Sequence, residues 1–283
     1  MKQRNIRQIV TGTAQIDGAG VHLVRVIGHA DVKDFDPFLM LDAFDSVNPA
    51  DYIKGFPWHP HRGIETVTYL VRGEIEHGDS LGNKGVIQDG GCQWMTAGGG
   101  IIHQEMPLAA PRMLGLQLWL NLPAKDKMTA PKYRDIAEKD IPICMDGTSR
   151  IGVIAGSYKE TDGAMRGEYV DTRFLDITVQ AGQMCVVPTP DDRTAFVYIL
   201  QGAFSFGTAE KDGAIYESHR AVLFSKGDSV TLTASPDGPA RCVFFEGKPL
   251  SEPVAWGGPI VMNTRAELDA AFRELDEGTF IKR

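Results

Sequence analysis

Short apolar runs separated by glycine and proline recur along most of this chain, which has 31 glycines and 16 prolines in 283 residues. Residues 65–72 alternate in character, with Val67, Tyr69 and Val71 on one face and mainly polar side chains on the other. Alternation with a period of two predicts a strand with one buried face. Comparable runs cover residues 20–30, 116–122, 174–180, 194–200, 221–224, 229–234 and 241–245. The pattern therefore predicts an all-β protein with many short strands.

One stretch near the end of the sequence has the pattern of a helix instead. Thr264 and Glu267 have the spacing of a capping box, and Gly278 is a natural stop. The apolar positions between them recur at helical intervals, at Leu268, Ala271, Phe272 and Leu275. We expect a structural helix whose apolar stripe covers part of a barrel.

Composition and charge narrow the class of protein. The net charge of -8 and the pI near 5.4 argue against direct nucleic-acid binding, which needs a basic face. The sequence contains neither an apolar run of roughly 18 residues, as a membrane span requires, nor a secretory signal. Its four cysteines are widely spaced and predict reduced thiols rather than a disulfide framework. We therefore expect a cytoplasmic location.

Three of the seven histidines fall in two short segments, residues 56–65 and 98–107, each of which also carries a carboxylate. Side chains two residues apart on a strand point the same way. His59 therefore shares a face with His61, and His103 shares one with Glu105. Two such pairs on facing strands would bring three imidazoles and a carboxylate to one point, which predicts a metal site.

The donor set limits the chemistry of this site. Imidazoles and a carboxylate without thiolates suit a borderline divalent metal such as Fe(II), Mn, Ni, Cu or Zn, and four protein ligands leave two octahedral positions open. Glu65 lies on the same odd-numbered face as His61, so the period alone does not choose between Glu65 and Glu105. His22, His29, His77 and His219 have no paired partner and are expected to be surface or core residues.

The second half of the chain repeats the first. Residues 66–73 align with residues 195–202, and the tyrosine and the final glycine of each segment coincide. The equivalents of His59, His61 and Glu65 are Pro188, Pro190 and Thr194. If the halves are duplicated barrels, the second has lost its metal. From Ala124 to Arg150 the sequence is polar and without sustained periodicity, as in a connector with a short edge strand.

The residues around the histidines resemble a known family. The segment from His59 to Glu65 is similar to the first cupin motif, and Gly100 with His103 to the second. The sequence of residues 56–67, 93–98 and 103–107 closely resembles that of pirins. This resemblance implies two cupin barrels in tandem, which are double-stranded β-helix or jelly-roll folds, with a short C-terminal helix. The expected ranges are a metal-binding barrel over 1–125, a connector over 126–150 and a metal-free barrel with the helix over 151–283.

The resemblance also implies a ligand set and an activity. In pirins a single metal, usually iron, is held by the residues matching His59, His61, His103 and Glu105, which leaves Glu65 a supporting or packing role. Fe(II) is the expected metal, with Mn, Ni, Cu, Co or Zn as alternatives. The implied activity is that of a quercetin 2,3-dioxygenase, which opens a flavonol ring with O₂. Glu105 could serve as the general base, and Phe56, Trp58 and Met106 are candidates for a pocket mouth that stacks an aromatic substrate.

The resemblance to pirins also implies a second possible function. Some pirins resemble redox-sensing regulators that bind a transcription factor or a metabolic enzyme, with the iron oxidation state altering a surface near the site. Here the metal would bias a conformational equilibrium rather than turn over a substrate. The sequence thus predicts a flavonol and O₂ as partners for the enzyme, or a protein partner for the regulator.

Overall fold

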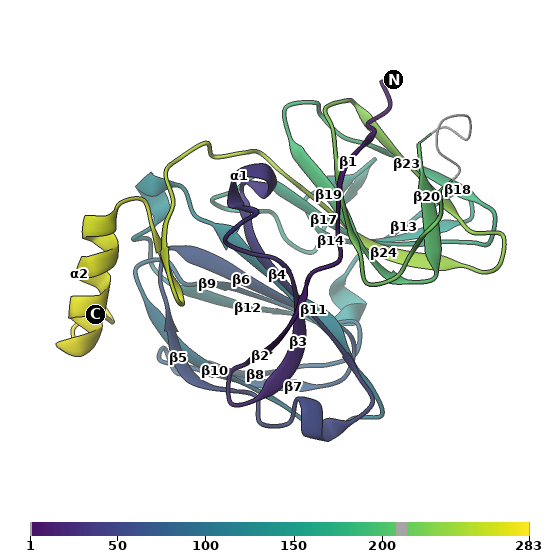
Figure 1. The fold of residues 1–283 in the computed structure, drawn as a ribbon. Helices are drawn as coiled ribbons and strands as arrows, with labels where there is room; N and C mark the ends of the chain where they lie inside the picture. The colour runs from purple at the N-terminus through teal and green to yellow at the C-terminus, as the bar shows by residue number, and fades with distance from the viewer. Residues whose placement is uncertain (1, 208–213, 283) are drawn as a thin grey trace. The chain divides into compact units, whose positions relative to one another are not determined.

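The computed structural model describes residues 2–207 and 214–282, which divide into two compact units (Figure 1). We call the unit of residues 13–138 and 250–282 the N-terminal barrel, and the unit of residues 2–12 and 139–249 the C-terminal barrel. Each unit is dominated by antiparallel strands, as the alternation predicted.

The N-terminal barrel consists of two sheets. One has seven strands in the order β12-β9-β6-β11-β4-β3-β2, and the other has four in the order β5-β10-β7-β8. The bounds of the seven are β12 (Lys132–Ile136), β9 (Cys92–Thr96), β6 (Ile64–Arg72), β11 (Met113–Asn121), β4 (Phe38–Ser46), β3 (Val21–Ile27) and β2 (Thr13–Asp17). The bounds of the four are β5 (Phe56–His61), β10 (Ile101–Pro107), β7 (Ile75–Asp79) and β8 (Lys84–Ile87).

The C-terminal barrel has the same construction, with strand orders β1-β22-β19-β24-β17-β14-β13 and β18-β23-β20-β21. The bounds of its larger sheet are β1 (Ile6–Val10), β22 (Ala221–Phe224), β19 (Thr194–Gln201), β24 (Ala240–Gly247), β17 (Thr172–Val179), β14 (Ser149–Ala155) and β13 (Ile143–Asp146). Those of the smaller sheet are β18 (Met184–Pro188), β23 (Ser229–Ala234), β20 (Ala203–Phe206) and β21 (Tyr216–Glu217). Strands β6 and β19, whose sequences align, occupy the same place in the two sheets, so the repeat seen in the sequence is also a repeat of topology.

Shorter elements complete the two units. Two hairpins are formed by β15 (Ser157–Tyr158) with β16 (Thr161–Asp162) and by β25 (Ala255–Gly257) with β26 (Ile260–Met262). The helical segments are α1 (Val32–Phe35), α2 (Arg265–Asp276) and the 3₁₀ turns η1 (Pro49–Asp51), η2 (Ala124–Asp126) and η3 (Glu138–Asp140). Among the described residues, no helix is both long and apolar enough to cross a membrane.

The division of the chain differs from the expected ranges at both ends. Residues 2–12 belong to the C-terminal barrel, where β1 pairs with β22 and takes the place that β12 has in the other barrel. The helix α2, expected with the second barrel, packs on β25 and β26 of the first. The expected connector contains β12, β13 and the start of β14, so it is divided between the two units. Short edge strands, and terminal segments that pack on the other barrel, are hard to predict from hydrophobic periodicity.

The helix itself has the predicted ends. The Thr264 hydroxyl accepts a hydrogen bond from the Glu267 backbone N–H, and the Glu267 carboxylate accepts one from the Thr264 backbone N–H. Leu268 and Ala271 are buried, whereas Phe272 is exposed at the edge of the stripe. Gly278 follows with a positive φ of 70°. The capping residues thus predicted the ends of this helix correctly.

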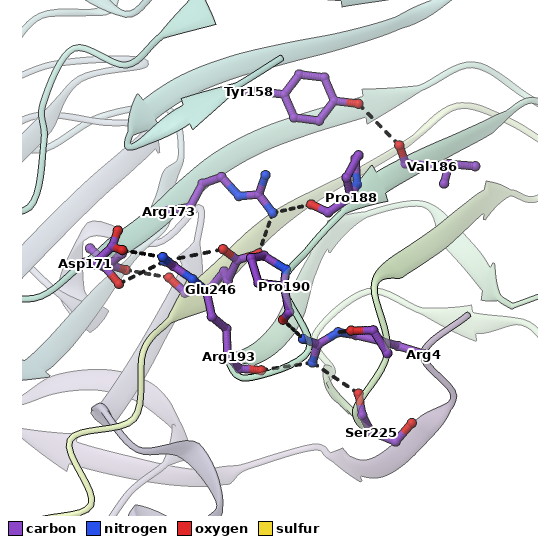
Figure 2. Close-up of polar contacts among 12 residues, drawn as sticks. Arg4, Tyr158, Asp171, Arg173, Val186, Pro188, Pro190, Arg193, Ser225 and Glu246 are labelled. Atoms are coloured by element: carbon purple, nitrogen blue, oxygen red, sulfur yellow. Dashed lines mark hydrogen bonds and ion pairs between the residues drawn. The ribbon is translucent and has the colours of Figure 1, made fainter. Parts of the chain in front are cut away.

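The interior of the C-terminal barrel is an apolar cluster in which Phe204, Val222 and Phe244 are fully buried. Two arginines of this barrel, Arg173 and Arg193, pair with the Glu246 carboxylate, as Figure 2 shows. Arg173 donates to the Glu246 carboxylate and to the Pro188 carbonyl oxygen. Apolar side chains thus fill the interior of the C-terminal barrel.

A buried arginine ties the N-terminal segment to this barrel. Arg4 is 1% exposed and donates to the backbone oxygens of Gly227, Arg193, Ser225 and Pro190 (Figure 2). In the repeat register, Pro188 and Pro190 stand where His59 and His61 stand in the other barrel. At these two positions the C-terminal barrel therefore has backbone oxygens bound by guanidinium groups in place of imidazoles.

We predict that Arg4→Ala lowers the free energy of unfolding of the C-terminal barrel by about 2 kcal/mol or more, because several buried carbonyl oxygens lose a charged donor. Hydrogen exchange measured by mass spectrometry should show the loss of protection in β1 and β22. Arg166→Ala is the control, because Arg166 pairs with Asp162 on the surface and is 76% exposed. Equal protection in both variants would contradict the prediction.

Candidate metal centre and its cavity

The pairing of β5 with β10 brings the three predicted histidines together. His103 lies opposite His59 in the register, and His61 shares their face of the sheet. The ring centroids of His59 and His103 are 4.3 Å apart, and those of His61 and His103 are 5.0 Å apart. Potential ligand atoms of all three lie within 4.8 Å of one another, and no other such group occurs in the described part of the chain. The predicted convergence of the three imidazoles is confirmed.

Backbone carbonyl groups orient two of these rings. The Nδ1 atom of His59 lies 2.9 Å from the Pro57 oxygen, and that of His61 lies 3.0 Å from the Pro259 oxygen. A carbonyl oxygen only accepts, so Nδ1 donates in both rings, which leaves the Nε2 lone pairs for a ligand. Burial lowers the pKa of His61 to about 3. The two Nε2 atoms are 3.1 Å apart, an arrangement that a shared cation stabilises.

His103 supplies an independent test of whether these residues fit a metal. It is fully buried, and neither of its ring nitrogens has a hydrogen-bond partner. Desolvation holds its pKa well below the usual range, with smaller contributions from the neighbouring histidines. A buried polar atom without a partner costs free energy. A metal ion that binds the lone pair of one His103 nitrogen removes that cost for this nitrogen, so the donor set fits the predicted ion.

Glu105 lines the same cavity as His59 and His61, but its oxygens are not part of the close group of ligand atoms that the three imidazoles form. Two donors hold its carboxylate. Thr68 donates to its Oε1 atom over 2.9 Å, and the Gln117 amide donates to its Oε2 atom over 2.7 Å. The Trp119 indole N–H donates to the Gln117 side-chain oxygen over 3.2 Å, which fixes the orientation of that amide. Neither Thr68 nor Gln117 was predicted from the sequence as a residue of the site. The alternation of β11 was the available signal, since it places Gln117 and Trp119 on one face.

Glu65 lies on the other face of β6. It pairs in register with Thr96, whose hydroxyl donates to its Oε1 atom over 2.6 Å. The face of β6 that meets Glu105 is that of Thr68, so the expectation that Glu65 lies on the same face as His61 is wrong. The chain turns from one sheet to the other at Gly63, with a φ of 78°, and this turn breaks the alternation.

His59 and His61 line a cavity of about 500 Å³, whereas the fully buried His103 is not part of its lining. Of the three residues expected at its mouth, Phe56 lines the cavity, whereas Trp58 and Met106 do not. Trp58 is 55% exposed, because it alternates with His59 along β5. His29, which spacing had set aside, also lines it. His77, likewise set aside, is buried with its ring centroid 5.3 Å from that of His103.

Residues 20–120 match the family described as Pirin, and residues 174–281 match the Pirin C-terminal cupin domain. A "Pirin-like protein" of Caulobacter vibrioides is 42% identical over 283 residues, which cover 99% of this chain and 100% of that protein. The chain belongs to the pirin family.

Other pirin relatives extend the comparison. A protein of Pseudomonas aeruginosa named "Putative quercetin 2,3-dioxygenase" is 41% identical, with 98% of each chain covered. A crystal structure titled quercetin 2,3-dioxygenase from Acinetobacter baumannii is 32% identical, with a TM-score of 0.88 and 98% of each chain covered. These comparisons confirm the expected fold class of two cupin barrels in tandem with a C-terminal helix.

Proposed function

We propose that this pirin is a metal-dependent dioxygenase that opens the ring of a flavonol such as quercetin. The observation that carries the proposal is the cluster of His59, His61 and His103, of which His59 and His61 line a cavity of about 500 Å³. Cavities of this size accommodate small-molecule ligands, and mainly apolar walls with a few polar groups are typical of such sites. The names of the Pseudomonas and Acinetobacter relatives support the same reaction class.

The residues that would hold the metal are His59, His61, His103 and Glu105. Fe(II) is the metal that we propose, and Mn, Ni, Cu, Co or Zn would also suit imidazole and carboxylate ligands. The metal would supply Lewis acidity, which lowers the pKa of an enolic hydroxyl that coordinates to it. The other contributions would come from the protein.

Glu105 is the proposed general base. Each of its oxygens already accepts one hydrogen bond, from Thr68 and from Gln117, so the carboxylate is fixed in the cavity wall. Each oxygen keeps a further lone pair, and one of these could accept the proton of a flavonol enol. Trp119 and Met40 give the cavity apolar walls that limit the access of water to the reacting ring.

Turnover tests this proposal directly. We expect protein loaded anaerobically with Fe(II), mixed with quercetin and then exposed to air, to bleach the near-visible absorption band of quercetin and to release carbon monoxide. His103→Ala, prepared in the same way, controls for the spontaneous oxidation of quercetin. The absence of turnover with Fe, Mn, Ni, Co and Cu would overturn the proposal.

The carboxylate assignment has a test of its own. Glu105→Gln should lower metal affinity at least about tenfold, as loss of ligand-supporting groups does, and should abolish turnover because the base is lost. Glu65→Gln is a matched control, since Glu65 is also buried and also accepts from a threonine hydroxyl. Metal affinity measured by competition with a chromophoric chelator distinguishes the two variants. A larger loss in Glu65→Gln would show that the carboxylates are assigned the wrong way round.

A further inference from the structure

The cavity contains a second group of residues that the proposed reaction does not use. The His29 imidazole stacks on the Trp256 indole, with ring centroids 3.7 Å apart and an angle of 23° between the planes. The Trp256 indole N–H donates to the Gly258 oxygen over 2.8 Å, which fixes the orientation of the ring. Trp119 lies next to it, with centroids 5.8 Å apart. All three rings line the cavity and give it flat aromatic surfaces.

An ion-pair network from three neighbouring strands lines the same cavity. Arg25 on β3 forms a bidentate pair with Asp42 on β4, at 2.9 and 2.8 Å, and also donates to Asp17 on β2 over 2.8 Å. The Asp42 side chain is only 6% exposed, so little of its carboxylate is accessible to a ligand. The Asp17 side chain is 49% exposed and receives one bond from Arg25 and one from the Gly18 N–H. Asp17 thus retains lone pairs for a ligand.

The two groups lie close together. Partial burial, with a smaller contribution from the positive charge of Arg25, lowers the pKa of the His29 imidazole, which favours the neutral ring that stacks. Hydrogen bonds from Gly18 and Arg25 lower the pKa of Asp17 against the opposing effect of its burial. Asp17 therefore stays a carboxylate, which can only accept hydrogen bonds. A ligand at this position must present a flat face and a donor.

We propose that Asp17 and Trp256 form a recognition subsite for a hydroxylated aromatic ring of the substrate, a part of the molecule that does not react. This inference rests on the proposed function in that the same cavity holds the reacting ring. Trp256, stacked with His29, selects a planar ring. Asp17 accepts a hydrogen bond from a phenolic hydroxyl of that ring. The carboxylate of Asp17 disfavours substrates with an acidic group at this point, because like charges repel.

Binding without turnover tests the subsite. We would load the protein with Zn(II), which has no redox chemistry, and measure the affinities for quercetin and for galangin by calorimetry. These flavonols share the reacting ring system, but only quercetin has hydroxyls on its pendant ring. The wild-type protein should prefer quercetin about tenfold, as expected for a hydrogen bond to a charged acceptor. Asp17→Ala should remove this preference and leave galangin binding within about threefold of the wild-type value.

Asp89→Ala is the matched control. Asp89 also accepts from an arginine, Arg72, and from a backbone N–H, that of Gly73, and its 52% exposure is close to that of Asp17, but it lies outside the cavity lining. This variant should keep the wild-type preference. Equal preference in the two variants, or a wild-type protein that binds both flavonols equally or binds neither, would overturn the subsite.

The aromatic half of the subsite has its own pair of variants. Trp256→Leu keeps apolar bulk but removes the flat face, and should weaken both flavonols about tenfold, as expected for loss of ring stacking. Trp256→Phe should recover most of that loss. Failure of the phenylalanine to recover binding would contradict a stacking role. If the Zn(II) protein behaves as expected but the Fe(II) protein opens no ring, the proposed dioxygenase function fails and the subsite stands.

Discussion

The register between β5 and β10 is the constraint on which the functional half of this protein depends. It sets His59 opposite His103 and leaves both side chains, with that of His61, on one face. A shift of one residue would turn every side chain of one strand to the opposite face and disperse the cluster. The carbonyl oxygens of Pro57 and Pro259 then select the ring nitrogen that faces the shared point. Backbone geometry thus prepares the lone pairs before any ion binds.

The two barrels show two uses of one topology. The N-terminal barrel has polar groups in its interior. Its imidazoles suit a cation, which would offset the free-energy cost of burying them. The C-terminal barrel fills its interior with apolar side chains, and guanidinium groups of Arg4 and Arg173 bind the backbone oxygens of Pro188 and Pro190. Among the described residues, this barrel has no cluster of metal-ligating side chains. Apolar packing and arginine hydrogen bonds occupy the positions that correspond to the histidines.

Much of this arrangement could be predicted from local sequence signals. Alternation located the central strands, the capping box located α2, and the spacing of His59 and His61 predicted the cluster. The face of β6 was not predictable in the same way, because the turn at Gly63 resets the alternation between two sheets. His29 has no partner nearby in the sequence, and Trp256 reaches the cavity from a distant segment. Residues brought together only by the tertiary fold leave no periodic signal.

The oxygen atom that orients His61 lies 198 residues beyond it along the chain. Synthesis runs from the N-terminus, and domains generally fold as units while it proceeds. The strands that bear the three histidines are made early, but Pro259 is made only after the whole of the C-terminal barrel, which ends at Pro249. The ring of His61 gains its orienting partner only then. The site therefore reaches its final geometry late, when the last segment of the chain joins the barrel whose strands were made first.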